Sequence, residues 1–308
     1  MDAPHTLPPP ALPIWRRVWQ FPLVVMLVAM ALVVLVGAAV TIVVAILTNV
    51  FGSGTDEPLA EPVGVMTLVA ALIVLQKGVL RRLGERRHDD LRFADAPQGL
   101  ALGTVAAFGL FSAIVGVAAL LGAYRIDGWG GMSNWLFVLF TAGISAGFVE
   151  EFVFRGIVFR WIEEFGGSWA ALFISSALFG VVHIGNDNAT WFSSFAIAIE
   201  AGVMFGAAYM LTRSLWMPIG LHFGWNVTQG LVWDVPISGN AVDGLVDARL
   251  VGDPLISGGA FGLEASVIAL LVAGGFGVWL VRRAASKGEV MQPRWVRRRR
   301  VASVPARI

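Results

Sequence analysis

The sequence predicts an all-α protein, a multi-pass transmembrane helical bundle of about eight spans. Hydrophobic residues occupy 57% of its 308 positions and charged residues 14%, whereas soluble domains contain roughly 45–50% and about 25%. Long uncharged apolar runs recur along the chain, and basic residues concentrate in alternate loops. Because this much apolar surface needs lipid to face, the composition excludes an ordinary water-soluble domain.

Each span is predicted from an apolar run able to cross a hydrocarbon core of about 30 Å, which takes about 20 residues. The first run, 21–48, is far longer than the core of a signal peptide, so we expect a retained anchor helix. Charged residues, glycine, proline or asparagine bound the other runs. These cover approximately 63–80, 98–122, 134–154, 168–183, 191–211, 215–233 and 258–281.

The loop charges predict the orientation of the chain, because Lys and Arg are enriched in cytoplasmic loops. Basic residues dominate the N-terminal arm, the second, fourth and sixth loops and the C-terminal tail, whereas the loops between them hold only Arg125 and Arg249 alongside several acidic residues. Both termini are therefore expected in the cytoplasm, and the short loops favour a bacterial plasma membrane. The predicted parts are a disordered cytoplasmic arm (1–20), a transmembrane domain (21–283) and a basic cytoplasmic tail (284–308).

The basic tail holds an arginine cluster between Arg294 and Arg300. Such a cluster can bind anionic lipid head groups, at about 1 kcal/mol per basic residue near the surface. It can also simply enforce the topology, which is the interpretation we favour. The cluster is too short to suggest a nucleic-acid partner. The chain contains no cysteine, which excludes disulfides, thiolate metal sites and a cysteine nucleophile.

Polar residues at membrane depth are the strongest functional signal, because each ionisable group there costs at least about 2.5–3.5 kcal/mol on insertion scales. Residues four apart share one face of a helix. This spacing predicts contact between Glu151 and Arg155, and a common direction for His222 and Asn226. The three clusters are Glu150, Glu151 and Arg155 in the fourth span, His183 at the end of the fifth, and His222 and Asn226 in the seventh.

The depths of these clusters can be compared by counting residues. Glu150 and His183 lie about 16 residues, or about 24 Å, on either side of a turn expected at 166–167. The polar stretch 160–164 suggests that this turn projects into the cytoplasm. His222 follows a cytoplasmic loop by about nine residues, or about 10 Å of depth. We therefore expect Glu150, His183 and His222 to meet in one cavity near the inner leaflet.

A carboxylate, two imidazoles and an amide in such a cavity suit the hydrolysis of an amide bond. Desolvation makes a carboxylate more basic towards water, while a histidine or an amide stabilises the oxyanion that forms. Neighbouring residues on a helix point about 100° apart, so Glu150 and Glu151 cannot share one task. Glu151 is expected to be the structural partner of Arg155, which leaves Glu150 as the base.

A zinc ion is the alternative means of activating water, because two histidines and one carboxylate form a known catalytic zinc set. Glu150, His183 and His222 would then be its ligands. The sequence lacks His-Glu-x-x-His, the usual helix motif of zinc proteases, and the choice stays open. Glu200 and Glu264, within the sixth and eighth spans, are expected to line the cavity or cap a buried donor.

The order Glu-Glu-x-x-x-Arg, Phe-x-x-x-His and His-x-x-x-Asn, each on its own span, resembles the CAAX-protease and bacteriocin-processing family (CPBP, also called Abi). The similarity covers about 130–235, including the stretch 206–219 before His222. It implies an intramembrane endopeptidase acting on a membrane-associated protein or peptide. By this resemblance Glu150 activates water, His183 and His222 are the two family histidines, and Asn226 stabilises the oxyanion. Glu151 and Arg155 complete the first motif.

Two other functions compete with the peptidase. One is a non-catalytic membrane scaffold or bacteriocin-immunity protein that works by binding a partner. The other is a proton-coupled transporter that uses the glutamates and histidines as a relay. Transporters usually contain paired repeats, and the sequence shows none, so this function ranks last. The short chain and simple loops look bacterial, which argues against a prenylated substrate.

Overall fold

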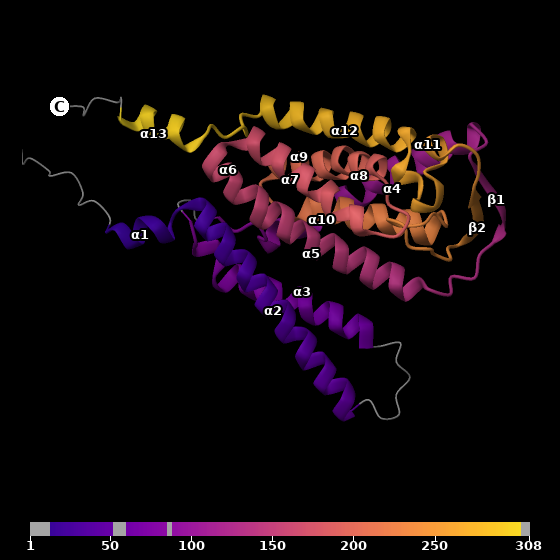
Figure 1. Cartoon of the computed structure of the whole chain (residues 1–308), viewed down its shortest axis with the longest axis horizontal. Coiled ribbons are helices and arrows are strands. Elements are labelled where there is room, and N and C mark those ends of the chain that lie inside the picture. The colour runs from indigo at the N-terminus through magenta and orange to yellow at the C-terminus, as the bar shows by residue number, and fades with distance from the viewer. Residues whose placement is uncertain (1–12, 52–59, 85–87, 303–308) are drawn as a thin grey trace, which may run out of the picture.

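The computed structural model describes residues 13–51, 60–84 and 88–302. Its long helical segments form a bundle (Figure 1), which confirms the predicted all-α multi-pass fold. The long segments are α2 (Pro22–Phe51), α3 (Ala60–Gly78), α4 (Ala96–Leu120), η4–α5–η5–α6 (Phe137–Gly166), α7 (Ser168–Val182), α8–η7–α9 (Trp191–Thr212), α10 (Trp216–Val227) with η8 (Thr228–Val232), and α12 (Val267–Ser286).

Short elements connect and flank these segments. Two of them, α1 and α13, lie at one end of the bundle, and the ribbon formed by β1 and β2 lies at the opposite end (Figure 1). The short elements are α1 (Ile14–Trp19), η2 (Leu80–Arg82), η3 (Phe93–Asp95), β1 (Tyr124–Trp129), η6 (His183–Gly185), β2 (Val246–Leu250), α11 (Pro254–Ser257), η9 (Gly259–Phe261), η10 (Leu263–Ala265) and α13 (Arg294–Ala302).

Seven helices within the described residues are long and apolar enough to cross a membrane. Seven of the eight predicted runs correspond to them. The remaining run, 215–233, forms α10 and η8, a shorter helix that is mostly buried inside the bundle. Large apolar side chains such as Leu27 and Val34 are mainly exposed. An apolar outer surface of this kind would be a liability in water and suits contact with lipid.

Glycines allow α10 to pack directly against α4. A Cβ at Gly103 would lie 2.4 Å from the carbonyl oxygen of Met217, and one at Gly220 would lie 2.6 Å from that of Leu100. No side chain of any size fits at either position without moving the backbone of the other helix. This contact fixes the depth and rotation of α10, which carries two of the predicted site residues.

Four helical stretches of the described residues have the wider π geometry, namely η4 (Phe137–Ser145), η5 (Phe154–Phe159), η7 (Ala198–Val203) and η8. Between η4 and η5 lies α5 (Ala146–Val153), and η7 lies between α8 (Trp191–Ile197) and α9 (Met204–Thr212). Stretches of π-helix inside α-helices are frequently found at functional sites. The positions of these stretches therefore indicate α5, η7 and the end of α10 as candidate functional elements.

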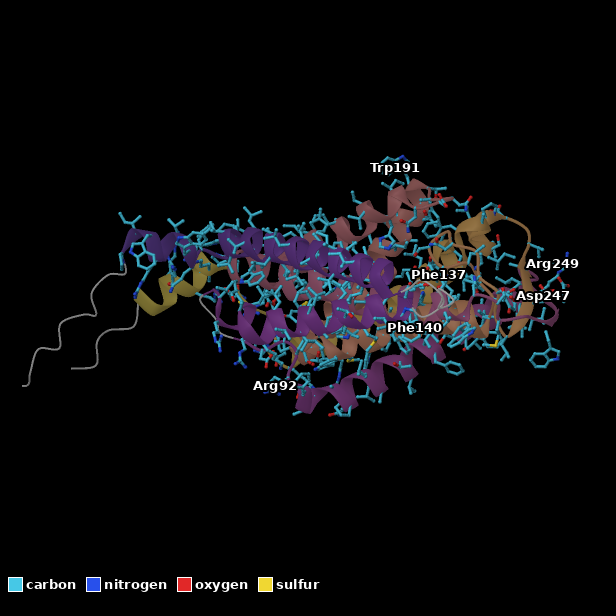
Figure 2. The ribbon with its side chains drawn as sticks, turned by 90° about the horizontal axis from the view of Figure 1, so that it is seen from below. Arg92, Phe137, Phe140, Trp191, Asp247 and Arg249 are labelled. Atoms are coloured by element: carbon cyan, nitrogen blue, oxygen red, sulfur yellow. The ribbon has the colours of Figure 1, made fainter. Side chains whose placement is uncertain are left out.

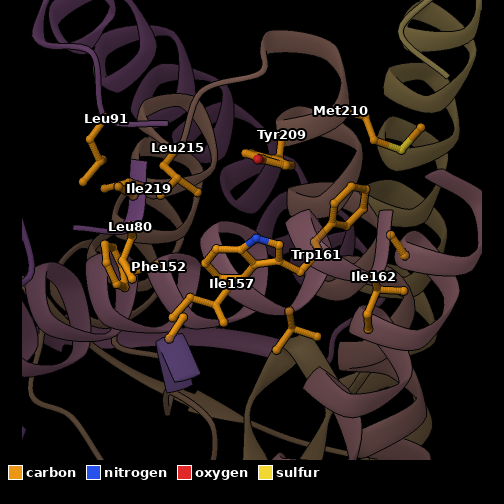
Figure 3. Close-up of a cluster of buried hydrophobic side chains, with 14 of the residues drawn as sticks. Leu80, Leu91, Phe152, Ile157, Trp161, Ile162, Tyr209, Met210, Leu215 and Ile219 are labelled. Atoms are coloured by element: carbon orange, nitrogen blue, oxygen red, sulfur yellow. The ribbon is translucent and has the colours of Figure 1, made fainter. Parts of the chain in front are cut away.

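The turn expected at 166–167 is present, with Gly167 at a φ of 83°. The preceding helix α6 (Arg160–Gly166) is packed into the bundle and its polar residues are buried, so these residues do not form an exposed tip; the cytoplasmic position of the turn stays a prediction. Arg160 is buried and donates to Asp90 at 2.7 Å, while Trp161 lies in an apolar cluster with Ile157 and Leu215 (Figure 3). The polar stretch has its charges neutralised inside the protein, which the sequence alone does not reveal.

The end of the bundle with α6 also holds the two flanking helices. Ser168 donates its backbone N–H to Met291, just before α13, at 3.0 Å, and Arg294 lies over the ring of Phe21 at 5.2 Å. Residues 14–19 are helical, although the sequence predicts a disordered arm through residue 20; residues 1–12 lie outside the described residues. This helix contains Trp15 and Trp19, and tryptophan is enriched at membrane–water interfaces.

The β ribbon closes the other end. The antiparallel strands β1 and β2 pair Tyr124 with Leu250 and Trp129 with Val246, with an irregularity in register between Ile126 and Gly128. Asp247 and Arg249 lie at this end, and Trp191 at the start of α8 projects from the bundle (Figure 2). The sequence does not predict this ribbon, because its strands are short and about 120 residues apart.

Candidate active site

The first predicted cluster is centred on a buried ion pair. Arg155 Nη1 donates to Glu151 Oε1 at 2.9 Å, and both side chains are fully buried. The other terminal nitrogen of Arg155 donates to the carbonyl oxygens of Ala201 and Gly202 at 3.1 and 3.0 Å. These carbonyls belong to the π-helical η7, where the wider turn leaves them available. Arg155 therefore joins α5 to η7.

His222 joins the same carboxylate from a different helix. Its Nδ1 lies 3.0 Å from Glu151 Oε1, and its ring stacks on that of Phe205 with centroids 5.0 Å apart. An ionised carboxylate only accepts hydrogen bonds, so Nδ1 carries the proton. The free position of the ring is Nε2. Four residues along α10, Asn226 donates its amide to the carbonyl of Ala142 at 2.7 Å.

His183, at the end of α7, pairs with the other glutamate. Its Nδ1 lies 2.7 Å from the carbonyl oxygen of Phe179, an acceptor, so Nδ1 carries the proton here too. Its Nε2 lies 4.0 Å from Glu150 Oε2. That oxygen is buried and has no hydrogen-bond partner, although a third of the Glu150 side chain is exposed. Glu150 thus keeps a free acceptor facing a histidine.

A small cavity of about 20 Å³ lies beside these groups. Its size suits one water molecule. The polar residues lining it are His183, Glu200, His222, Asn226, Ser238 and Glu264. Glu150 is not among the lining residues, so the structure brings both histidines and Asn226 to one cavity and places Glu150 at its margin, against His183.

The cavity lies next to the segment that connects α10 to β2. Asn186, just after His183, donates to the carbonyl of Ser238 at 3.2 Å, and Ser238 also lines the cavity. Ser238 belongs to the segment between α10 and β2, which the charge pattern assigns to the outer side. His183 lies at the end of α7 that faces this segment, whereas the counted depths place the cavity near the inner leaflet, so the leaflet stays a prediction.

The predicted zinc ligands do not converge. Within the described ranges, no three His, Cys, Asp or Glu side chains are placed to hold one metal ion. His222 directs Nδ1 at Glu151 rather than at Glu150. The site residues as placed do not fit the two-histidine, one-carboxylate set.

The sequence assigned no definite role to two acidic residues that line the cavity. Glu200 lies in η7 and Glu264 in η10, and both are buried. Glu264 was expected inside the last span, but α12 begins at Val267 and Glu264 occupies the turn before it. Because both residues lie within apolar runs, the sequence indicated that they are buried. That they lie near the histidines depends on the packing of α8 against η10, which the sequence does not show.

Residues 132–228 match the family model described as type II CAAX prenyl endopeptidase Rce1-like. That segment contains all three motifs. The resemblance to the CPBP family is confirmed over this segment. At the level of the family, the match indicates an intramembrane endopeptidase of the CAAX type, hence a membrane hydrolase. Comparison with curated proteins and comparison with solved structures each gave no match.

Proposed function

We propose that this protein is an intramembrane endopeptidase in which Glu150 activates a water molecule against a peptide bond of a membrane-associated protein or peptide. The observation that carries the proposal is the free, buried Glu150 Oε2 at 4.0 Å from His183 Nε2. A water molecule about 2.8 Å from both atoms would subtend an angle near 90°. Such a water can donate one hydrogen to each group, which makes it a better nucleophile.

The bond from Phe179 prepares His183 for this task. Because the carbonyl oxygen holds the proton on Nδ1, Nε2 presents a lone pair toward Glu150. Glu150 takes the proton from the water as it attacks and delivers it to the leaving amine, so the proton count balances over the reaction. His183 holds the water in place and accepts its second hydrogen bond.

His222 and Asn226 are proposed to stabilise the oxyanion. The imidazolium form of His222 donates from Nε2, and its charge is balanced by Glu151 through Nδ1. Asn226 uses one amide hydrogen for Ala142 and retains a second one for the substrate. Donors held in place before the reaction need no reorganisation as charge develops, which is the main source of such catalysis. Glu151 and Arg155 position His222 without touching the substrate.

The basic end of the bundle is proposed to face the cytoplasm of a bacterial cell, with the ribbon outside. The α6–α7 turn, α1 and α13 share one end, which is consistent with both termini on one side. The basic tail is proposed to enforce this orientation and to contact anionic lipid. No step of the proposed mechanism uses a metal or another cofactor.

The test is cleavage of a library of apolar peptides by the purified protein in detergent. Glu150→Gln should abolish cleavage while the melting temperature stays within about 2 °C of wild type. Asp127→Asn, which changes an exposed carboxylate on β1, is the matched control and should retain full activity. Activity that survives Glu150→Gln would refute the mechanism. No cleavage by wild type of any peptide would favour the scaffold or immunity function, and loss of activity with 1,10-phenanthroline would favour zinc.

A further inference from the structure

Two carboxyl groups outside the three motifs reach the cavity of the candidate active site. Glu200 comes from η7 and Glu264 from η10, and their side chains are 1% and 4% exposed. Both line the cavity together with His183, His222 and Asn226. They are close enough for the charge of Glu264 to act on Glu200. A buried pair of this kind is costly unless something balances it.

The two carboxyl groups differ in their hydrogen bonds. Glu264 accepts from the backbone N–H of Ser238 and interacts with the side chains of Gln229 and Trp225. These donors tie η10 to α10 and the loop that follows it. Glu200 Oε2, in contrast, is buried and has no hydrogen-bond partner. Glu264 therefore has a structural role, while Glu200 keeps a free acceptor at the cavity wall.

The charges around the cavity do not balance within the protein. Glu150, Glu151, Glu200 and Glu264 are near it, but no Lys or Arg of the described residues lines it. Arg155 directs its terminal nitrogens at Glu151 and two carbonyls. Arg155 and an imidazolium His222 supply two positive charges against four carboxyl groups, so Glu200 and Glu264 must be balanced either by protons, which burial favours, or by a cation. A cationic ligand would relieve this imbalance.

The shape and lining of the cavity select the kind of cation. A volume of about 20 Å³ holds one group of the size of water, which matches an ammonium more closely than a planar guanidinium. The rings of Phe179, Phe205 and Trp225 also line it, and aromatic faces attract ammonium groups. The His, Asp and Glu side chains of the described part do not form a metal-binding group. An ammonium is therefore the better match.

We propose that Glu200 is a specificity-determining residue that binds the ammonium of a substrate lysine next to the scissile peptide bond. The inference rests on the proposed peptidase function. His183 and His222 line the same cavity. A lysine ammonium bound to Glu200 therefore holds the substrate beside the groups that act on its peptide bond. The substrate class is then a membrane-associated peptide with a lysine at the cleavage site.

A binding test separates this inference from catalysis. n-Butylammonium chloride should raise the melting temperature of wild type and of Glu150→Gln, whereas 1-butanol at the same concentration should not. The effect should disappear in Glu200→Gln. If sodium chloride raises the melting temperature as much as butylammonium chloride does, the site binds an inorganic cation rather than a lysine, and the proposal is overturned. No effect of butylammonium on wild type would also overturn it, and would show that the carboxyl pair is balanced by protons alone.

A cleavage test then addresses specificity. Paired peptides carry lysine or the apolar isostere norleucine at each position around the cleaved bond. Wild type should favour lysine at one position by about tenfold in kcat/KM, the usual effect of a charge-assisted hydrogen bond. Glu200→Gln should lose this preference and retain cleavage of the norleucine peptide, and Glu200→Asp should keep part of the preference. An unchanged preference in Glu200→Gln would refute the proposal. If wild type cleaves nothing, the peptidase function fails, and the butylammonium test still decides whether Glu200 binds an ammonium.

Discussion

Glu151 Oε1 accepts hydrogen bonds from both Arg155, four residues along the same helix, and His222 of α10, at 2.9 and 3.0 Å. One oxygen atom thus connects two helices that are about 70 residues apart in the sequence. The bond to His222 fixes which ring nitrogen carries the proton. The motif arginine consequently acts on His222 through Glu151, and the first and third motifs form one buried network.

This network predicts different outcomes for the two adjacent glutamates. Glu151→Gln removes the charge that balances Arg155, and breaking a fully buried ion pair costs about 3–5 kcal/mol. Glu150→Gln removes no hydrogen bond of Glu150 Oε2, which has none, so the protein should stay folded and lose activity. Thermal unfolding in detergent and peptide cleavage measure the two effects separately. If Glu151→Gln is stable but inactive while Glu150→Gln remains active, then Glu151 rather than Glu150 is the catalytic base.

Asn226→Asp should weaken both folding and catalysis. The Asn226 amide donates to the buried carbonyl of Ala142 at 2.7 Å, and a carboxylate there cannot donate. Leaving that carbonyl unpaired costs about 1–3 kcal/mol, and the proposed oxyanion donor is also lost. Asn134→Asp is the matched control: Asn134 donates to Ala241 in an exposed position, and its Oδ1 accepts from the backbone N–H of Asp243, a bond that aspartate keeps. Its effect should stay within about 0.5 kcal/mol. Equal melting temperatures for the two variants would contradict the buried bond.

The sequence predicts well those features that depend on local spacing. Glu151 and Arg155 lie four residues apart and form the expected ion pair, and Gly167 makes the expected turn between two helices. The apolar runs locate the spans because hydrophobicity over about 20 residues is a strong signal. The ordered motifs pointed to the segment that matches the family model.

The features that escaped prediction depend on contacts distant in sequence. The bond between His222 and Glu151 requires α10 to pack at one depth against α5 and α4. The sequence suggests that Arg160 is an exposed loop residue, and only the structure shows that it donates to Asp90. The pairing of β1 with β2 depends on two short segments, and only the three-dimensional structure shows that they meet.

Asp243, in the loop at the ribbon end, makes acid stability a measurable property. The Ser133 side chain, followed by the backbone N–H groups of Ser133 and Gly131, which donate to Asp243 at 2.8 and 2.9 Å, lowers the pKa of Asp243 to about 2. Because the pKa of Asp243 in the folded protein lies below its unfolded value of about 3.9, the ionised carboxylate stabilises the fold above about pH 4. This stabilisation is lost as the pH falls toward 2. Melting temperatures between pH 5 and 2 should therefore fall more steeply for wild type than for Asp243→Asn. Parallel curves would show that these bonds do not form in solution.

The proposed orientation predicts that reporters at residue 308 and in the loop near Asp243 label opposite sides of the membrane. The basic end of the bundle carries Arg160 of α6, Arg213 and the arginines of α13, and Lys and Arg are retained on the cytoplasmic side. Alkaline phosphatase should be active only in the loop fusion, and a cytoplasmic reporter such as green fluorescent protein only at the C-terminus. Labelling of one side by both fusions would remove the proposed topology.

The close contact of α10 with α4 predicts that an added methyl group at Gly220 disturbs the active site from outside it. A Cβ there would lie 2.6 Å from the carbonyl oxygen of Leu100, so Gly220→Ala must push the helices apart, at a cost of about 1–3 kcal/mol. His222 lies two residues further along α10, so cleavage should fall more than stability alone explains. Gly109→Ala is the matched control, because it lies on α4 and a Cβ there meets nothing within 4 Å. Alanine favours a helix over glycine by up to about 1 kcal/mol, so this variant should be as stable as wild type or slightly more stable, with unchanged activity. If Gly220→Ala also melts and cleaves like wild type, then α10 is not held against α4 as described, and the geometry derived for His222 and Asn226 fails with it.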